Sequence, residues 1–420
     1  MSVLSTLGLA AVAILLAEGI ARLRGGKEAL VATVLVQILA LAALTWAVQA
    51  GLLVPLVVLA PALVALMGTV AVLARPPGWR EPVELARLAE TTLLVALTFA
   101  CEELLPVALL WLVSLLPGLR YREHPGVSRR PFALKALLSA GAALSALVLL
   151  RFAPEQGTLA WLALVLAAAI RMGVPPFSPL VLSGYQRLPM GRHALVAAAR
   201  PSVALLLAAR LALPEAVEPL APLLQGWAAT AAVLAGLQGL AAQDLRRSVG
   251  AMATTQASII LYGLVSTGHT GVAGALVQWA GLGLSLVGIG VLVEAIESRV
   301  GEARARSVRG LMGPAPGMAL LFLLFAASMS GFPGTTGFVG EDLIMQAPST
   351  QPVLWRGLLL LATALNGFTM LRVFARVFLG RLQPEEVRAF PALTLRERAV
   401  LGVVVLALGV LVASPAWVVA

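Results

Sequence analysis

Two neighbouring carboxylates, Glu341 and Asp342, close a stretch rich in glycine and proline, Gly331–Asp342, that interrupts a long apolar run. Carboxylates in apolar surroundings are costly without partners, so they are typical of sites that exchange a proton or hold a cation. Glycine and proline at the same place free backbone groups that lipid cannot satisfy. We therefore expect a broken membrane helix with an ion site at the break. Alternatively, Asp342 only caps the resumed half-helix.

A second interruption follows the apolar run Trp161–Ile170, and Arg171 stands directly before it. Arginine stays charged when it is buried, so Arg171 can bias a neighbouring carboxylate or hold an anion but cannot pass a proton on. The helix-breaking residues of the two interruptions are Gly173, Pro175 and Pro176 in the first, and Pro333, Gly334 and Gly337 in the second.

The elements that carry these residues are membrane helices. Of 420 residues, 60% are hydrophobic and 12% are charged, and the mean hydropathy is +0.95, which is outside the range of soluble domains. The chain therefore reads as an all-α polytopic membrane protein with about fourteen spans of near-membrane length. No loop is long enough for a separate catalytic domain, and we expect no cofactor.

The net charge of +10 comes from arginines in short loops between apolar runs. These loops all fall on one side, which favours positive-inside topology with both termini outward over binding of nucleic acid. One cysteine, Cys101, excludes a disulfide framework, and three histidines far apart in the sequence do not predict a metal site.

The two breaks fall in the seventh and twelfth predicted spans, Leu159–Phe177 and Met318–Gln346. An offset of five makes these spans cross in opposite directions, as an inverted repeat requires. Within one transmembrane domain, 1–420, we expect three N-terminal helices (1–80), two five-helix repeats (84–213 and 220–380) and a C-terminal helix (396–420). The alternative is that membrane helices simply tolerate glycine and proline.

Three passages carry a family resemblance. Asp244–Ala251 resembles the charged entry to a central helix, Phe132–Lys135 resembles the start of helix six, and Phe332–Glu341 is similar to a PGT-x-GF-x-GE signature. All three are features of the antiporter-like subunits of respiratory complex I and of multisubunit cation/proton (Mrp) antiporters. The resemblance implies fourteen helices with inverted repeats, a broken helix in each, and a central line of buried charges that conducts protons.

The resemblance also transfers site residues. Glu102 and Glu103 match a glutamate of helix five, with an exposed turn as the alternative, and Arg171 stands where relatives carry a lysine. Lys135 is the one lysine within a predicted helix and either joins the relay or snorkels to the surface, while Leu282 replaces a histidine. The resulting ion-translocation candidates are Glu102, Glu103, Lys135, Arg171, Arg200, Glu341 and Asp342, with Gln278 and Asn366 as polar lining.

The resemblance implies a proton- or cation-translocating subunit with no redox or hydrolytic chemistry of its own, working in a complex I-like or hydrogenase-like assembly. Its partners would be other membrane subunits and the lipid bilayer, with a soluble cytoplasmic subunit as a further possibility, in a prokaryotic inner membrane. Two alternatives stay open. One is a scaffold whose relay has decayed, and the other is a subunit that couples energy to bicarbonate uptake.

Overall fold

A computed structural model describes residues 3–49, 56–75, 82–101, 103–115, 130–187, 206–207, 209–210, 214–300, 309–347, 353–380 and 391–413. Within these ranges the regular elements are all helices, which confirms the predicted all-α class. Five of the described helices are long and apolar enough to cross a membrane, judged by length and composition, and four shorter apolar helices accompany them. The polytopic membrane architecture is therefore confirmed, while the count of fourteen spans stays a prediction.

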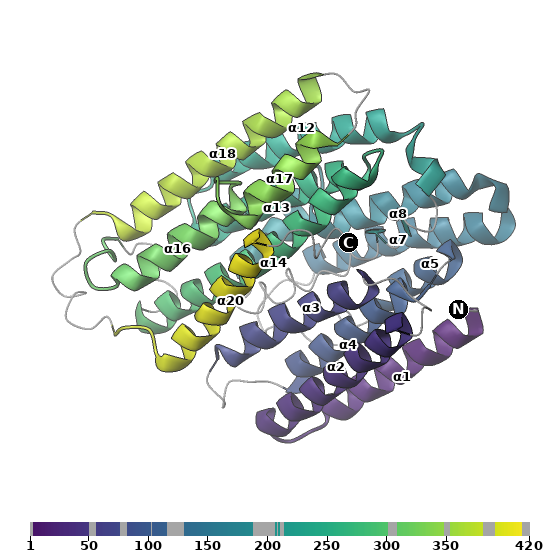
Figure 1. Cartoon of the computed structure of the whole chain (residues 1–420), viewed down its shortest axis with the longest axis horizontal. Helices are drawn as coiled ribbons and strands as arrows, with labels where there is room; N and C mark the ends of the chain where they lie inside the picture. Colours follow the sequence, from purple (N-terminus) through teal and green to yellow (C-terminus); the bar gives the residue numbers. More distant parts are fainter. Residues whose placement is uncertain are drawn as a thin grey trace. The chain divides into compact units, whose positions relative to one another are not determined.

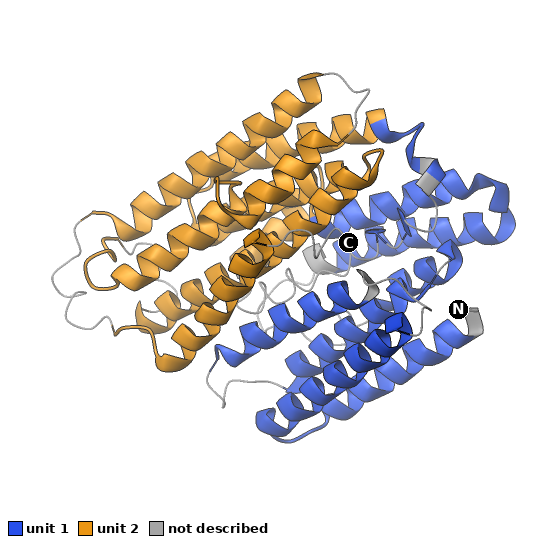
Figure 2. Cartoon of the chain, in the orientation of Figure 1, with its two compact units in different colours: residues 1–172, 199–221, 418–420 blue, residues 173–198, 222–417 orange. Residues whose placement is uncertain are grey.

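The chain divides into two compact units (Figure 2). Unit 1 comprises 1–172, 199–221 and 418–420, and unit 2 comprises 173–198 and 222–417. One division point, between residues 172 and 173, falls inside the first predicted break, and another, between residues 221 and 222, lies near the start of the second predicted repeat. The helices of unit 1 are α1 Val3–Ala21, α2 Gly26–Gln49, α3 Leu56–Leu73, α4 Pro82–Phe99, α5 Leu104–Val113, α7 Arg130–Phe152 and α8 Gly157–Met172, with short 3₁₀ turns η2 Pro154–Gln156 and η3 Pro214–Val217. The helices of unit 2 are α9 Ser178–Arg187, α12 Ala221–Ala241, α13 Leu245–Leu264, α14 His269–Val300, α16 Pro316–Met329, α17 Thr336–Gln346, α18 Val353–Phe378 and α20 Leu395–Ala413.

Helix α4 is the centre of the N-terminal part of unit 1, because α1, α2 and α3 all pack against it. Two polar contacts lie inside this packing: Arg75 Nη1 is 2.6 Å from Glu84 Oε2, and Gln37 donates to the Thr92 hydroxyl at 3.4 Å. Further along the chain, α7 and α8 form an antiparallel hairpin through η2, and α5 packs against α7 (Figure 1). Helix α5 ends at Val113, where Ser114 forms its C-cap.

Helix α14 is the core helix of unit 2, and it runs for 32 residues, most of them buried. It packs against α13, α16, α17 and α20, with its closest packing on α17 (Figure 1). Glycines allow the close approach: a Cβ added at Gly274 would lie 2.8 Å from the carbonyl oxygen of Gly340 on α17. Contact through small residues is the usual way in which membrane helices pack.

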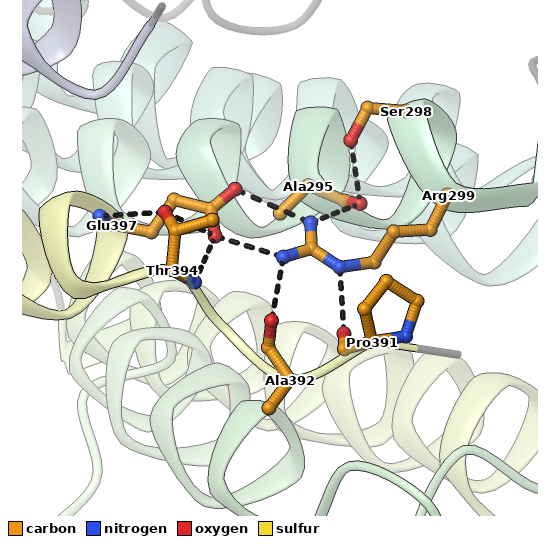
Figure 3. Close-up of polar contacts among 7 residues, drawn as sticks. All are labelled: Ala295, Ser298, Arg299, Pro391, Ala392, Thr394 and Glu397. Atoms are coloured by element: carbon orange, nitrogen blue, oxygen red, sulfur yellow. Dashed lines mark hydrogen bonds and ion pairs between the residues drawn. The ribbon is translucent and has the colours of Figure 1, made fainter. Parts of the chain in front are cut away.

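The C-terminal end of α14 is joined to α20 by a network of charged hydrogen bonds (Figure 3). Arg299 donates to Glu397 at 2.8 and 3.2 Å and to the carbonyls of Pro391 and Ala392 at 2.8 and 3.0 Å. Glu397 also accepts from the backbone N–H of Thr394 at 2.7 Å, and Thr394 accepts from the backbone N–H of Glu397 at 3.3 Å. Thr394 and Glu397 thus form a capping box that starts α20, and Arg299 neutralises its carboxylate.

Arg299→Ala is expected to lower the melting temperature of the purified protein in detergent by roughly 5 °C. The substitution leaves a poorly exposed carboxylate without its cation, and breaking such a pair costs on the order of 3 kcal/mol. Arg22→Ala is the matched control, because Arg22 is 82% exposed and lies 3.9 Å from Glu18. Exposed pairs of this kind contribute about 0–1 kcal/mol. Equal melting temperatures for the two variants would contradict the role given to Arg299.

Candidate functional site

The site lies where the path of the chain breaks between α16 and α17. Helix α16 ends at Met329, and α17 begins at Thr336. In a continuous helix the Met329 carbonyl would accept from the backbone N–H of residue 333, but Pro333 has none. Gly331 turns the chain away with a φ of +64°, a value that favours glycine. The break therefore leaves a backbone acceptor in the interior of unit 2, and it needs a partner from elsewhere.

Side chains from α13 and α18 supply these partners. Gln256 donates to the Met329 carbonyl at 2.7 Å, and Asn366 donates to the same oxygen at 3.4 Å. The Nε2 of Gln256 also donates to Glu341 Oε1 at 2.9 Å, and Thr363 donates to Glu341 Oε2 at 2.8 Å. Gln278 on α14 donates to Gln256 Oε1 through a short contact. We call Gln256, Gln278, Glu341, Thr363 and Asn366, with the Met329 carbonyl, the amide–carboxyl cluster.

The carboxyl group of this cluster is deeply enclosed. Glu341 is 8% exposed, Gln278 is 1% exposed, and Gln256 and Asn366 are fully buried. A Cβ added at Gly331 would lie 2.4 Å from Glu341 Oε2, so the carboxyl group packs directly against the turn of the break. Both hydrogen-bond partners of Glu341 among the described residues are neutral.

Two buried oxygens of the cluster have no hydrogen-bond partner among the described residues: Gln278 Oε1 and Asn366 Oδ1. Both belong to amide groups whose nitrogen atoms already donate within the cluster. Buried polar atoms in native proteins are nearly always partnered, so each such oxygen calls for a specific reason. The cluster therefore contains more hydrogen-bond acceptors than its own donors satisfy.

Asp342 takes no part in the cluster. It is exposed and accepts from Gln346 at 2.7 Å, one turn along the same helix. It does not cap α17 either, because Thr335 is the N-cap and accepts from the backbone N–H of Phe338 at 3.4 Å. Of the two carboxylates selected from the sequence, the structure thus places only Glu341 in the interior. Gln278 and Asn366, which were predicted as polar lining, are also buried there, and whether they line an ion path stays a prediction.

The other predicted break lies between α8 and α9, at the boundary of the two units. Gly173, with a φ of +78°, Pro175 and Pro176 all lie between these helices. The Pro175 carbonyl has a proline, Pro179, four residues further on, and it accepts from the indole N–H of Trp227 at 2.9 Å. The Met329 and Pro175 carbonyls thus each have a proline four residues later, and that proline has no backbone N–H to donate. In each break a side chain of another helix donates to the carbonyl instead.

Arg171 lies at the end of α8, next to the C-terminal end of α5. Its guanidinium donates to the Ser114 hydroxyl at 2.6 Å and to the Ser114 carbonyl at 3.3 Å, and lies 5.5 Å from the centre of the Trp111 ring. A cation is favoured there, because the C-terminal end of a helix carries partial negative charge. Arg171 therefore has a clear structural role in unit 1.

Lys135 lies at the same level as Arg171 along the hairpin of α7 and α8. Ser139 accepts from Trp111 at 3.3 Å and donates to the Ala167 carbonyl at 3.2 Å, which joins the two helices at that level. Lys135 is four residues before Ser139, and Arg171 is four residues after Ala167. In an antiparallel pair both steps run in the same direction and keep to the same faces. Lys135 and Arg171 thus stand one helical turn beyond the shared contact.

Glu103 is not part of this arrangement. It is exposed and forms the N-cap of α5, whereas Arg171 binds at Ser114 at the other end. The ten residues of α5 separate the two ends by about 15 Å. Glu103 is therefore exposed, as in the alternative prediction of an exposed turn. Glu102 and Arg200 lie outside the described residues.

Glu90 on α4 was not predicted as a site residue, but it is fully buried in unit 1. Its position among the apolar residues that follow Glu84 was a usable signal. Gln256 and Thr363 were also left out of the predicted site, because uncharged polar residues in membrane helices usually serve packing.

Comparison with known proteins gives the family of the chain. Residues 133–366, more than half of the chain, match the sequence profile of the family described as NADH:quinone oxidoreductase/Mrp antiporter, transmembrane. The chain belongs to this family. The matched region contains the amide–carboxyl cluster and both breaks, and it begins in α7 just before Lys135.

Individual members of the oxidoreductase/antiporter family are more distant. Subunit N of the NADH-quinone oxidoreductase of Alkalilimnicola ehrlichii is 28% identical over 242 residues, which cover 55% of this chain and 49% of that subunit. The chain spans about half the length, or less, of the relatives it matches.

Solved structures of the family share the fold over nearly the whole chain. A chain of respiratory complex I from Thermus thermophilus superposes with a TM-score of 0.76 at 21% identity, covering 99% of this chain and 96% of that one. A chain of the Mrp complex from Dietzia sp. DQ12-45-1b gives 0.80 at 15% identity, covering 99% and 95%. At these identities the likeness establishes the fold alone.

Proposed function

We propose that this protein is a membrane subunit that translocates protons, or another small cation, within a larger assembly. The observation that carries the proposal is Glu341, a buried carboxyl group at a broken helix whose described partners are the neutral groups of Gln256 and Thr363. Family membership supports the same function, because the family is named for NADH:quinone oxidoreductase and Mrp antiporter subunits.

The chemistry of the amide–carboxyl cluster suits the exchange of a cation. A buried carboxylate whose partners are neutral is costly, so in the resting state it holds a proton or a positive ion. Amide and hydroxyl groups can rotate to donate to the ionised form or accept from the protonated form. Glu341 can therefore alternate between two charge states without a fixed cation that would hold it in one of them.

The cations of unit 1 would act differently. Arg171 cannot release its proton, so Arg171 and Lys135 would set the local potential, with Lys135 as the residue able to titrate. Glu90 and Glu102 are further acidic candidates for this half. In this proposal the ion path runs past both breaks, and the five-helix segments 84–213 and 220–380 are inverted repeats. The breaking residues Gly173, Pro175, Pro176, Pro333, Gly334 and Gly337 would shape it.

The arrangement in the membrane follows from the loops. With the basic loops on the cytoplasmic side of a prokaryotic cell membrane, both termini would lie outside. The subunit would pack against other membrane subunits, and a soluble cytoplasmic subunit could drive it. Such an arrangement needs no redox group on this chain.

A scaffold is the second candidate, and the contacts of Arg171 favour it. The guanidinium is bound to Ser114 and lies over Trp111, so it joins the end of α8 to the end of α5 whether or not ions move. A scaffold needs the fold and the interfaces but not the buried carboxyl group.

The double variant Lys135→Met with Glu341→Gln separates the two candidates. The assembly would be purified through a tag on another subunit, and proton flux would be measured in proteoliposomes with an entrapped pH dye. A translocating subunit predicts that the assembly stays intact while the flux falls to the level of empty vesicles. Intact assembly with unchanged flux would overturn the proposal in favour of the scaffold.

A further inference from the structure

We infer that unit 2 binds the head group of an acidic phospholipid where α12 ends and α13 begins, beside the last two turns of α18. The inference goes beyond ion translocation and does not depend on it. It comes from two exposed arginines, Arg247 on α13 and Arg372 on α18, which stand at one end of an exposed apolar helix face.

The three helices meet at Gly239, and this contact places both arginines at the same level. A Cβ added at Gly239 would lie 3.0 Å from the Thr369 hydroxyl oxygen on α18 and 3.6 Å from the Ala251 Cβ on α13. Arg372 follows Thr369 by three residues, and Arg247 precedes Ala251 by four. Residues at these spacings share a helix face. Both arginines therefore lie one turn from the common contact, toward the end of α12.

The guanidinium of Arg372 is held at the C-terminal end of α12. Its Nη2 donates to the carbonyls of Gly239 and Ala242 at 2.9 and 2.5 Å, and its Nη1 donates to the Leu240 carbonyl through a short contact. A guanidinium has five N–H groups, so two remain for another acceptor. No carboxylate among the described residues forms an ion pair with Arg372, and the partial charge of a helix end offsets only part of a full positive charge.

Arg247 adds a second positive charge at this level. It is exposed, and no described residue forms a hydrogen bond or an ion pair with it. Its neighbour Arg246 is already bound to Glu297, whose Oε2 lies 2.6 Å from Arg246 Nη2. Asp244 is the acidic residue nearest in sequence to Arg247, and within the described part of the chain it forms no ion pair with either arginine. Two cations against one carboxylate leave this place positively charged.

The outward face of α18 suits the acyl chains of such a lipid. Leu361, Phe368 and Leu371 are 47%, 62% and 54% exposed. They form one stripe at helical spacing, and Arg372 continues that stripe. Helix α18 is also one of the helices long and apolar enough to cross a membrane. An exposed apolar stripe that ends in a cation matches the order of acyl chain and head group in a phospholipid.

The arginines lie at the depth of the head groups. Helix α12 has 21 residues and is therefore about 31 Å long, close to the roughly 30 Å of a bilayer hydrocarbon core. Because Arg372 binds the last carbonyls of α12, its guanidinium stands at the edge of that core. The basic loops predict this end to be cytoplasmic, and the cytoplasmic leaflet carries the anionic lipids. A phosphate group with net negative charge is the ligand that two guanidinium groups prefer there.

Photo-crosslinking with lipids tests the site directly. The purified assembly would be reconstituted with a small amount of phosphatidylglycerol or phosphatidylcholine that carries a photoreactive group on its acyl chain. Crosslinked peptides of α18 would then be counted by mass spectrometry. We expect phosphatidylglycerol to label the stripe Leu361–Leu371 at least about fivefold more than phosphatidylcholine, since one basic residue near an anionic surface contributes a factor of about five.

Arg247→Gln is the diagnostic variant, and Arg22→Gln is the matched control. Because no described residue contacts Arg247 through a hydrogen bond or ion pair, its replacement removes a charge and leaves the fold intact. The preference for phosphatidylglycerol is expected to fall about fivefold. Arg22 is 82% exposed and belongs to a basic loop predicted on the same side, so its replacement is expected to leave the preference unchanged. Melting temperatures equal to wild type verify that both variants are folded.

Three outcomes would overturn the lipid site. The first is equal labelling by the two lipids, or an unchanged preference in the folded Arg247→Gln assembly. The second is loss of the labelling in an excess of inorganic phosphate, which would show that the arginines take a free anion. The third is crosslinking of the same stripe to another subunit in place of lipid, which would show that a protein covers this face.

Persistence of the labelling in phosphate, together with its loss in Arg247→Gln, supports the lipid. The result is independent of ion flux, because the arginines lie at the end of α12 and not in the amide–carboxyl cluster.

Discussion

Glu341→Gln is expected to reduce ion flux through the reconstituted assembly by at least about tenfold. Positioned acid–base groups typically accelerate proton transfer by about a hundredfold or more, and background leak limits the difference that can be measured. Glutamine keeps the size of the side chain, its oxygen can accept from Gln256 and its nitrogen can donate to the Thr363 hydroxyl, but it cannot lose or gain the charge. The loss would therefore be functional rather than structural.

The measurement is the initial rate of pH change in proteoliposomes after a fixed driving force is imposed. Asp342→Asn is a close control because it neutralises the next residue of the same helix, where the side chain is exposed and bonded to Gln346. Wild-type flux is expected from that variant. If the two variants lose flux equally, the distinction between the buried and the exposed carboxylate is wrong.

Gly337→Ala is expected to destabilise unit 2 by about 3 kcal/mol or more, since overpacking a filled interior costs about 1–3 kcal/mol even where side chains can adjust. Here the obstacle is backbone: an added Cβ would lie 1.9 Å from the Ser328 carbonyl oxygen. Relief requires α17 to move away from α16. That movement would also pull Glu341 from Gln256, so stability and ion binding should be lost together.

Thermal unfolding in detergent and the yield of intact assembly measure this effect. Gly367→Ala on α18 is the control, because nothing lies within 4 Å of a Cβ added there, although Asn366 precedes it. Alanine in a helix interior is favoured over glycine by about 0.5–1 kcal/mol, so this variant should match or exceed wild-type stability. A Gly337→Ala protein with wild-type stability would show that the packing at the break is looser than described.

The breaks were predictable because glycine and proline act locally. Gly331 and Pro333 dictate where α16 must end, and no tertiary information is needed to see it. Thr335 rather than Asp342 caps α17, because a capping residue must stand at the helix boundary. That boundary lies six residues before Glu341, so Asp342 is already inside the helix. Both residues are visible in the sequence, but only the position of the turn shows which of them caps the helix.

The contents of the site were harder to predict. Glu341, Gln278 and Asn366 come from three helices, and nothing local distinguishes them from polar residues that only pack helices together. Gln256 binds both the Met329 carbonyl and Glu341, a role visible only once α13 is placed beside the break. Glu103 illustrates the reverse case: its motif resembles that of the family, but Glu103 is the N-cap of α5 and is exposed.

The proline at position 333 also constrains how this protein can change over generations. With Pro333 in place, the Met329 carbonyl depends on two side-chain donors, Gln256 and Asn366. Loss of one amide leaves the carbonyl with the other donor, whereas loss of both leaves a buried acceptor without either of them. Positions 256 and 366 therefore form an epistatic pair, in which the second substitution costs more than the first.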